Sequence, residues 1–261
     1  MIYEKRSLPG APGGVEGFLR ECFRLQRENG GKGINVLLTG PPGTGKTEGT
    51  KAFAQDAGLP FWKVPGENID PKVLLGRTVL IPDLDHPGSS RTVFVEGIIP
   101  RAVRNGGVLD LDEVNAYPQD VQIRLNELLD DGRTLTMQEE LDADGNPIVI
   151  KAHPELFIIG TQNPPTGANE ATNQLIPQLK SRFTKNLWMP APSKSEQVEF
   201  VRTRFGLDKQ QIETIRPQIE TTMEIANGLR DLEAKGRIDY SPTIREVFTV
   251  ANDLLHGVQY K

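Results

Sequence analysis

Residues 40–47 read GPPGTGKT and constrain the fold of this 261-residue chain more than any other segment. They follow the pattern G-x-x-x-x-G-K-[ST], in which glycines let successive backbone N–H groups turn inward and surround phosphate oxygens. An apolar run at residues 34–39 precedes the pattern, and a helical pattern at residues 47–57 follows it. The segment therefore predicts a phosphate-binding loop between a buried strand and a helix.

Each residue of this loop, together with the residue after it, is a candidate for nucleotide binding. Lys46 places a point charge for the β- and γ-phosphates, and the Thr47 hydroxyl is a candidate ligand of Mg²⁺. The positive end of the following helix favours the same anion. We expect ATP or ADP with Mg²⁺, held by Gly40, Pro41, Pro42, Gly43, Thr44, Gly45, Lys46, Thr47 and Glu48.

A second apolar strand, at residues 106–113 (GGVLDLDE), ends in two acids. We expect Asp112 to hold Mg²⁺, directly or through water, and Glu113 to act as the general base on the attacking water. Acidic pairs of this kind are common at surfaces and are weak evidence alone. Together with the phosphate loop upstream, this pair indicates a catalytic site. Asp110 shares a face with Asp112 by strand alternation. We expect Asp110 to be a hydrogen-bonded buried carboxylate, with a second metal role as the alternative.

A third apolar strand, at residues 156–163 (LFIIGTQN), ends in small polar residues. In a parallel sheet this strand should lie beside both the phosphate-loop strand and the Asp112 strand. Asn163 would then orient the lytic water or touch the γ-phosphate. Taken alone, Asn163 and Pro164 are only a turn signal.

The order of elements predicts an α/β fold. Apolar strand runs alternate with helical patterns, which indicates a parallel sheet with helices on both faces, a three-layer αβα core. From Ser193 onward the pattern is entirely helical, and Ser193 with Glu196 is a capping-box signature. We therefore expect a core at residues 1–191 and a small all-helical lid at residues 192–261. The strand runs are residues 61–64, 108–111, 156–160 and 186–189, and the clearest helices are residues 14–29 and 121–129.

Charge and composition exclude some classes of protein. The net charge is −5 and no block of Lys and Arg stands out, which argues against a nucleic-acid binder, although a ring could gather charge in its pore. No run of about 18 apolar residues exists to span a membrane. The first residues lack an apolar signal core, and the single cysteine, Cys22, fits a reducing compartment. We expect a cytoplasmic protein.

Two segments resemble those of a known family. Residues 97–115 (GIIPRAVRNGGVLDLDEVN) are similar to the Walker B region of MoxR-type and dynein-related AAA+ ATPases, and residues 152–164 (AHPELFIIGTQNP) to their sensor 1. The resemblance runs from about Gly14 to His256. It implies an ASCE P-loop core with a helical lid, assembled into a homo-oligomeric ring, commonly a hexamer, with ATP at each subunit boundary. It also implies that Lys46 and Thr47 belong to Walker A, Asp112 and Glu113 to Walker B, and Asn163 to sensor 1.

The resemblance extends to two arginines. Residues 179–183 (LKSRF) resemble the segment that carries the arginine finger, so Arg182 would reach the γ-phosphate of a neighbour. The family places its sensor 2 arginine close behind Ser-Pro, whereas here Thr243, Ile244 and Arg245 follow Ser241 and Pro242. We take Arg245 as the equivalent, with Ser241 as N-cap and Pro242 at the first helical position. A solvated arginine is the alternative.

Two insertions are typical of the helix-2-insert group of this family. The first is a hairpin near residues 77–97, and the second is a hairpin near residues 134–150, joined through Asp144, Gly145 and Asn146. In this group the hairpins approach the ring surface or pore and engage the client. The second hairpin is acidic, which disfavours a helicase.

The combined prediction is Mg²⁺-dependent hydrolysis of ATP to ADP and phosphate, driving remodelling, maturation or metal insertion in a protein partner. By resemblance only, this partner carries a von Willebrand A domain. Subunits of cobalt chelatase share the same segments and are a close relative. A DNA-translocating or helicase-type AAA+ motor is the alternative from another class. A nucleotide-gated scaffold is a third, and Glu113 and Arg182 argue against it. No glutamate switch can be assigned after residues 61–64.

Overall fold

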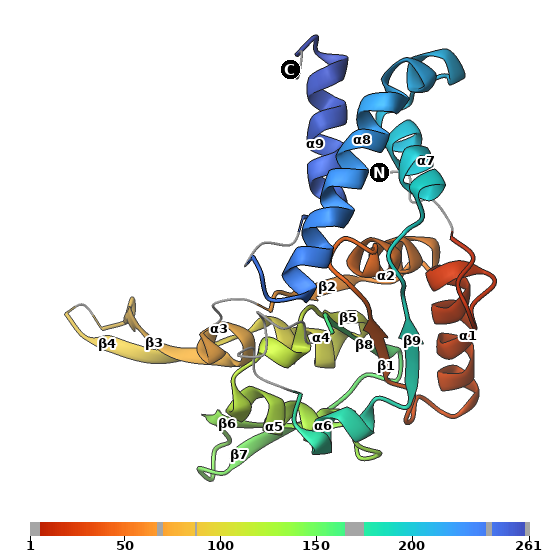
Figure 1. Cartoon of the computed structure of the whole chain (residues 1–261). Helices are drawn as coiled ribbons and strands as arrows, with labels where there is room; N and C mark the ends of the chain where they lie inside the picture. Colours follow the sequence, from red (N-terminus) through yellow and green to blue (C-terminus); the bar gives the residue numbers. More distant parts are fainter. Residues whose placement is uncertain (1–5, 67–69, 87, 165–174, 239–241, 259–261) are drawn as a thin grey trace.

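A five-stranded parallel sheet forms the centre of the computed structural model, which describes residues 6–66, 70–86, 88–164, 175–238 and 242–258 (Figure 1). The strand order is β2-β5-β8-β1-β9, and every pairing is parallel. The predicted place of β8, between the phosphate-loop strand and the Asp112 strand, is confirmed. The strands are β1 (Val36–Thr39), β2 (Phe61–Val64), β5 (Gly107–Leu111), β8 (Leu156–Gln162) and β9 (Lys185–Trp188).

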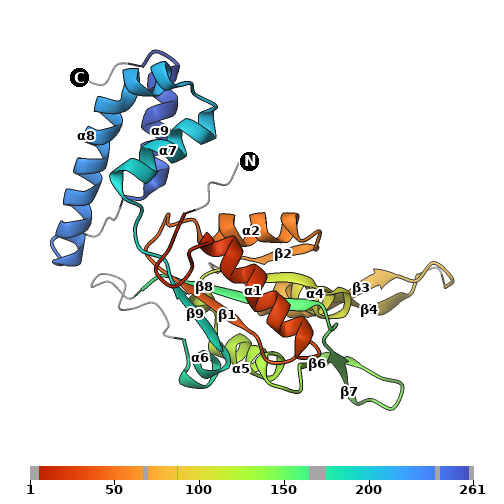
Figure 2. The ribbon, with the colours of Figure 1, turned by 90° about the vertical axis from the view of Figure 1, so that its right-hand side faces the viewer.

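Helices cover both faces of this sheet, because its strands are apolar on both sides (Figure 2). Val36 and Leu38 pack into one buried cluster with α1 (Gly14–Glu28) and α2 (Lys46–Asp56). Leu37 points the other way, into a second cluster. The predicted three-layer core is confirmed. The helices of the second cluster are α3 (Pro71–Leu75), α4 (Ile98–Asn105), α5 (Gln119–Leu129) and α6 (Pro177–Arg182).

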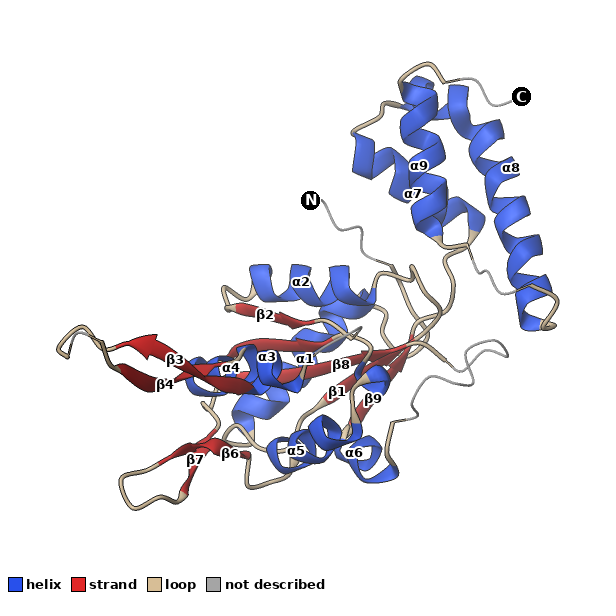
Figure 3. Ribbon diagram, turned by 90° about the vertical axis from the view of Figure 1, so that its left-hand side faces the viewer, coloured by secondary structure: helices blue, strands red, loops and turns tan. Residues whose placement is uncertain are grey.

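Three helices follow the sheet and pack around an apolar cluster of their own, α7 (Lys194–Phe205), α8 (Lys209–Ala234) and α9 (Ile244–Leu255). They stand apart from the layered core (Figure 3). The predicted capping box is present: Ser193 accepts a hydrogen bond from the Glu196 backbone, and the Glu196 carboxylate accepts one from the Ser193 backbone. The predicted division between residues 191 and 192 falls in the segment between β9 and α7.

The N-cap predicted for the last helix is wrong. Ser241 lies outside the described residues, and the helix begins at Ile244 with Thr243 as its N-cap. Pro242, predicted at the first helical position, therefore lies before the helix. Glu246 completes a capping box by accepting a hydrogen bond from the Thr243 backbone N–H at 2.7 Å. Arg245 therefore falls in the first turn of α9, as expected.

Two antiparallel hairpins extend from the core at the places where the sequence predicts insertions. Strands β3 (Gly76–Pro82) and β4 (Ser90–Glu96) lie between α3 and α4 and project away from the sheet (Figure 1). Strands β6 (Thr134–Leu141) and β7 (Pro147–Lys151) lie between α5 and β8. No helix in the described ranges has the length and apolar character needed to cross a bilayer.

Asp110 is an unusual group in this core. It is fully buried on β5, and neither carboxylate oxygen has a hydrogen-bond partner among the described residues. The predicted hydrogen-bonded carboxylate is therefore wrong for this part of the chain. Burial, together with the negative charge of Asp112, raises the pKa of Asp110 to about 8, and the nearby Lys63 opposes this shift. Asp110 is accordingly protonated at neutral pH.

Asp110→Asn should remove a pH-dependent destabilisation of the fold. The ordinary pKa of the carboxyl group is 3.8 and the folded value is about 8. Between these values the folded state binds the extra proton, so the free energy of unfolding falls as pH rises, by at most about 1.4 kcal/mol per pH unit. Asparagine has no such proton, and the variant should gain stability over the wild type across this window. Urea unfolding in EDTA at several pH values measures the difference, and parallel curves would contradict it.

Candidate active site

The backbone of the phosphate loop accounts for its glycines. Gly43 and Gly45 have φ angles of 77° and 88°, in the left-handed region that favours glycine. A Cβ atom on Gly40 would lie 2.2 Å from the carbonyl oxygen of Met189, so the loop passes directly against the end of β9. Gly45 is also the N-cap of α2, which places the positive end of that helix at the loop.

Lys46 is enclosed at the floor of this loop. Its ammonium donates to the carbonyl oxygens of Gly40 at 2.6 Å and Pro41 at 3.0 Å, and to Asn163 Oδ1 at 2.9 Å. Burial lowers the pKa of Lys46 to about 8, and the nearby Asp112 and Glu113 oppose this shift. These three acceptors are neutral oxygens. A phosphate bound in the loop would be an anionic acceptor and would bind the Lys46 ammonium more strongly.

Asp112 and Thr47 bring two oxygen donors together. Thr47 Oγ1 donates to Asp112 Oδ1 at 3.3 Å, and Thr161 Oγ1 donates to the same oxygen at 2.7 Å. Burial would raise the pKa of Asp112, but hydrogen bonds from Lys63, Thr161 and Thr47 hold it below the ordinary value. Neighbouring ligands in a Mg²⁺ octahedron lie about 2.9 Å apart, given bonds of about 2.0–2.1 Å. The two oxygens, 3.3 Å apart, need only a small movement to reach this spacing, so the donor pair fits Mg²⁺.

Glu113 is held by hydrogen bonds to one residue of β8 and to one residue that follows the C-terminal end of β8. Its φ of 50° lies in the left-handed region, which costs about 1–2 kcal/mol for a residue other than glycine. Its backbone N–H donates to Thr161 Oγ1 at 3.1 Å, and Asn163 Nδ2 donates to Glu113 Oε1 at 2.9 Å. A Cβ atom on Gly66 would lie 2.4 Å from the Cβ of Glu113, so the loop after β2 packs against it. Asn163 thus connects the Lys46 ammonium to the Glu113 carboxylate.

These groups open into a cavity of about 540 Å³ between the core and the lid helices α7 and α9. This volume is in the range of ordinary small-molecule sites. Beneath this cavity, the carbonyl oxygens of Gly40 and Pro41 accept hydrogen bonds from Lys46. The predicted site residues that line the cavity are Pro42, Gly43, Thr44, Gly45, Lys46, Thr47, Glu48, Asp112, Glu113, Asn163 and Arg245.

Arg182 lies elsewhere, at the end of α6. Its guanidinium pairs with Asp130 of the same chain at 3.0 Å, and both side chains are nearly half exposed. The structure therefore does not bring Arg182 to the cavity described above.

The cavity also contains residues that the sequence did not predict. Arg6 is buried and donates to Glu196 Oε1 at 2.9 Å and to the Pro190 carbonyl at 3.1 Å. The Arg204 guanidinium lies 4.9 Å from the centre of the Phe248 ring. No motif marks these positions. Lys63 did carry a signal, since it is a charged residue within the apolar run of β2. The unpredicted lining residues are Arg6, Lys63, Phe200, Thr203, Arg204, Ile244 and Phe248.

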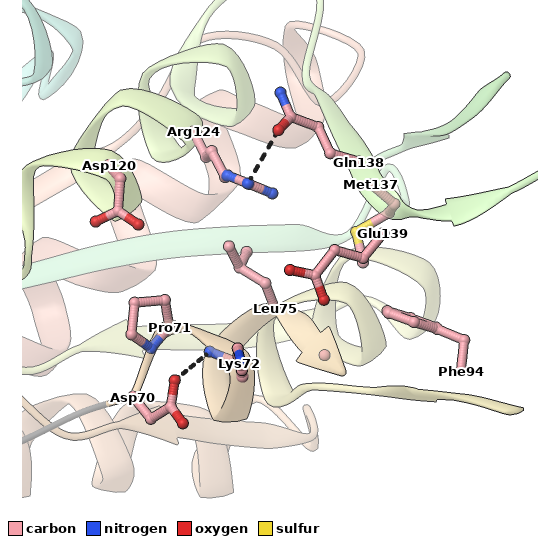
Figure 4. Close-up of a pocket in the computed structure, with 11 residues that line it drawn as sticks. Asp70, Pro71, Lys72, Leu75, Phe94, Asp120, Arg124, Met137, Gln138 and Glu139 are labelled. Atoms are coloured by element: carbon pink, nitrogen blue, oxygen red, sulfur yellow. Dashed lines mark hydrogen bonds between the residues drawn. The ribbon is translucent and has the colours of Figure 1, made fainter. Parts of the chain in front are cut away.

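A smaller cavity of about 260 Å³ lies where the two hairpins meet the core (Figure 4). Asp70 accepts a hydrogen bond from the Lys72 backbone at its edge, and Arg124 donates to Gln138 Oε1 at 3.2 Å. It contains none of the predicted site residues. Of these two cavities, only the larger is lined by the described residues of the phosphate loop.

Comparisons with known proteins identify relatives of this chain. The family described as "AAA domain (dynein-related subfamily)" matches residues 35–183. Protein NorQ of Paracoccus denitrificans is 32% identical over 177 residues, which cover 67% of this chain and 60% of that protein. Midasin of Dictyostelium discoideum is 37% identical over 149 residues, which cover 57% of this chain and 2% of midasin. The chain thus spans less than two thirds of these relatives.

A solved structure shares the fold. NtrX from Brucella abortus in complex with ATP superposes with a TM-score of 0.53 at 16% identity, over 93% of this chain and 51% of NtrX. This likeness concerns the fold alone, and the matches in sequence confirm the resemblance to MoxR-type and dynein-related AAA+ ATPases. The chain belongs to the dynein-related subfamily of AAA domains.

Proposed function

We propose that this chain binds ATP with Mg²⁺ and hydrolyses it to ADP and phosphate, as one subunit of a homo-oligomeric ring that remodels a protein partner. One observation carries the proposal: the Asn163 amide joins Lys46 to Glu113 beside the paired oxygens of Thr47 and Asp112. A phosphate-binding cation, a candidate base and a pair of metal-binding oxygens thus lie together in one cavity.

Each group has a definite part in this reaction. The loop N–H groups and Lys46 hold the β- and γ-phosphates, while Thr47 and Asp112 hold Mg²⁺, which neutralises phosphate charge when bound. Glu113 accepts a proton from water as the water oxygen forms its bond to the γ-phosphorus and the bond to the β–γ bridging oxygen breaks. Asn163 keeps the Glu113 carboxylate directed into the cavity.

The lid would complete the nucleotide site from the opposite side. Phe200 and Phe248 give the cavity an apolar, aromatic side suited to the adenine base, and Arg245 lies in the first turn of α9 beside the phosphate loop. The half-exposed side chain of Arg182 on α6, outside the cavity of its own chain, supports a finger that serves the site of a neighbouring subunit. Six subunits are the number that the family resemblance suggests.

The hairpins are our candidates for client contact. The β3–β4 hairpin projects from the core and its tip region carries Leu80 and Leu84, which are 74% and 89% exposed. Exposed apolar side chains on a projecting hairpin suit a protein surface better than a phosphate backbone. Maturation or metal insertion in a partner with a von Willebrand A domain is the finer form of the proposal, and it rests on the family resemblance.

Glu113→Gln should bind ATP normally but hydrolyse it at least about 10²-fold more slowly, because glutamine keeps the shape and the acceptor for Asn163 and loses only the base. Lys46→Ala should lose nucleotide binding instead, since it removes the cation from the loop floor. Calorimetry with ATP and steady-state phosphate release measure the two effects. Glu139→Gln, at an exposed position on β6, is the matched control. Near-normal turnover by Glu113→Gln would rule out this base.

Arg182→Ala should keep ATP affinity and lose activity by roughly 10³- to 10⁵-fold, the effect of an arginine on the transition state. Wild-type turnover per subunit should rise with protein concentration as rings form. Mixing Arg182→Ala with Glu113→Gln should restore activity, because one kind of mixed interface contains both wild-type residues. Lys180→Ala, on the exposed side of the same helix, is the control. A concentration-independent rate in a monomer, or mixing without rescue, would overturn the role between subunits.

A further inference from the structure

Lys63 occupies a distinctive position beside the candidate metal ligands. It lies on β2, an edge strand of the sheet, and pairs in register with Asp110 of β5. The next residue, Val64, accepts a hydrogen bond from the Asp112 backbone N–H at 2.9 Å. The backbone pairing between β2 and β5 therefore places the Lys63 side chain next to the Asp112 carboxylate independently of any ligand.

The contact itself is an ion pair on one carboxylate oxygen. Lys63 Nζ lies 2.8 Å from Asp112 Oδ2, while Oδ1 accepts from Thr47 and Thr161. The Lys63 side chain is 44% exposed and that of Asp112 is 22% exposed. Both oxygens of the candidate metal ligand thus have protein donors, and the only full charge among these donors is the ammonium of Lys63.

The two lysines of the cavity differ in how firmly they are held. Lys46 is buried and donates to three oxygens. Lys63 has a long, half-exposed side chain and, among the described residues, pairs with Asp112 alone. An ion pair with a half-exposed partner contributes little to stability, so water can replace the ammonium. Lys63 can therefore leave its partner while Lys46 stays in place.

We propose that Lys63 is an exchangeable counter-ion of Asp112, which competes with the divalent cation for this carboxylate and so weakens the coupling between metal and nucleotide binding. The proposal rests on the proposed function, in which Asp112 binds Mg²⁺. A monovalent ammonium and a divalent cation on the same carboxylate repel each other, and the flexible partner gives way. The ammonium neutralises Asp112 before the metal arrives.

A positioning role for Lys63 predicts the opposite change in metal binding. If Lys63 only positions the carboxylate for the metal, removing Lys63 releases Asp112 and weakens metal binding. If Lys63 competes, removing it strengthens metal binding. Arginine at this position keeps the charge and can hold a carboxylate with two parallel hydrogen bonds, so it should compete more strongly than lysine. The two variants therefore separate competition from positioning.

The test compares ADP affinity in excess EDTA with ADP affinity in saturating Mg²⁺, by calorimetry, on the full chain. The dissociation constant in EDTA divided by that in Mg²⁺ gives the factor by which the metal strengthens ADP binding. We call this factor the metal-dependent gain. For Lys63→Met the metal-dependent gain should rise about two- to five-fold, the size expected from the loss of a half-exposed ion pair. For Lys63→Arg the gain should fall. Lys151→Met, at an exposed lysine on β7, should leave it unchanged.

Binding of Mn²⁺ to the ADP complex, counted from the electron paramagnetic resonance signal of the free ion, should follow the same order. A metal-dependent gain that stays level or falls in Lys63→Met overturns the counter-ion role. Failure of the wild type to bind ADP in either buffer would overturn the proposed function itself. The two failures are therefore distinct, and neither measurement depends on turnover.

Discussion

The position of β8 between β1 and β5 is the constraint on which the candidate site depends. Parallel pairing sets Thr39 opposite Gln162, and Leu111 opposite Gly160, so the three strands end at one edge of the sheet. The groups that follow these ends, far apart in sequence, consequently share one cavity. A slip of one residue in β5 would turn Asp112 to the other face and separate it from both Thr47 and Thr161.

Asn163 has the right chemistry for the centre of such a site. A side-chain amide is both acceptor and donor, so it can bind the Lys46 cation through Oδ1 and the Glu113 anion through Nδ2. A carboxylate or an ammonium could serve only one of these partners. Because a single side chain contacts both, a phosphate that draws Lys46 away also removes a partner of Asn163. In the proposed reaction, phosphate binding would therefore be linked to the position of Glu113 through this one residue.

The sequence predicted the site residues that come directly after a strand. An apolar run that ends in polar residues indicates both the strand and the position where it ends. The sequence did not predict Arg6 or Phe248, since their place depends on how the lid packs and periodicity carries no such information. The N-cap of α9 was recoverable. Thr243 has a glutamate three residues on, whereas Ser241 has Ile244, and only the first pair can form a capping box.

Asn35 connects the site to Arg182 through the backbone. It is buried directly before β1, and its side-chain amide donates to the carbonyls of Leu129 at 2.8 Å and Arg182 at 2.9 Å. The ends of α5 and α6 are thereby fixed to the strand that leads into the phosphate loop. The Arg182 side chain, by contrast, rests on a half-exposed pair with Asp130 that contributes little in water. A rigid backbone with an exchangeable side chain is what a residue needs if it is to reach a neighbouring subunit without disturbing its own.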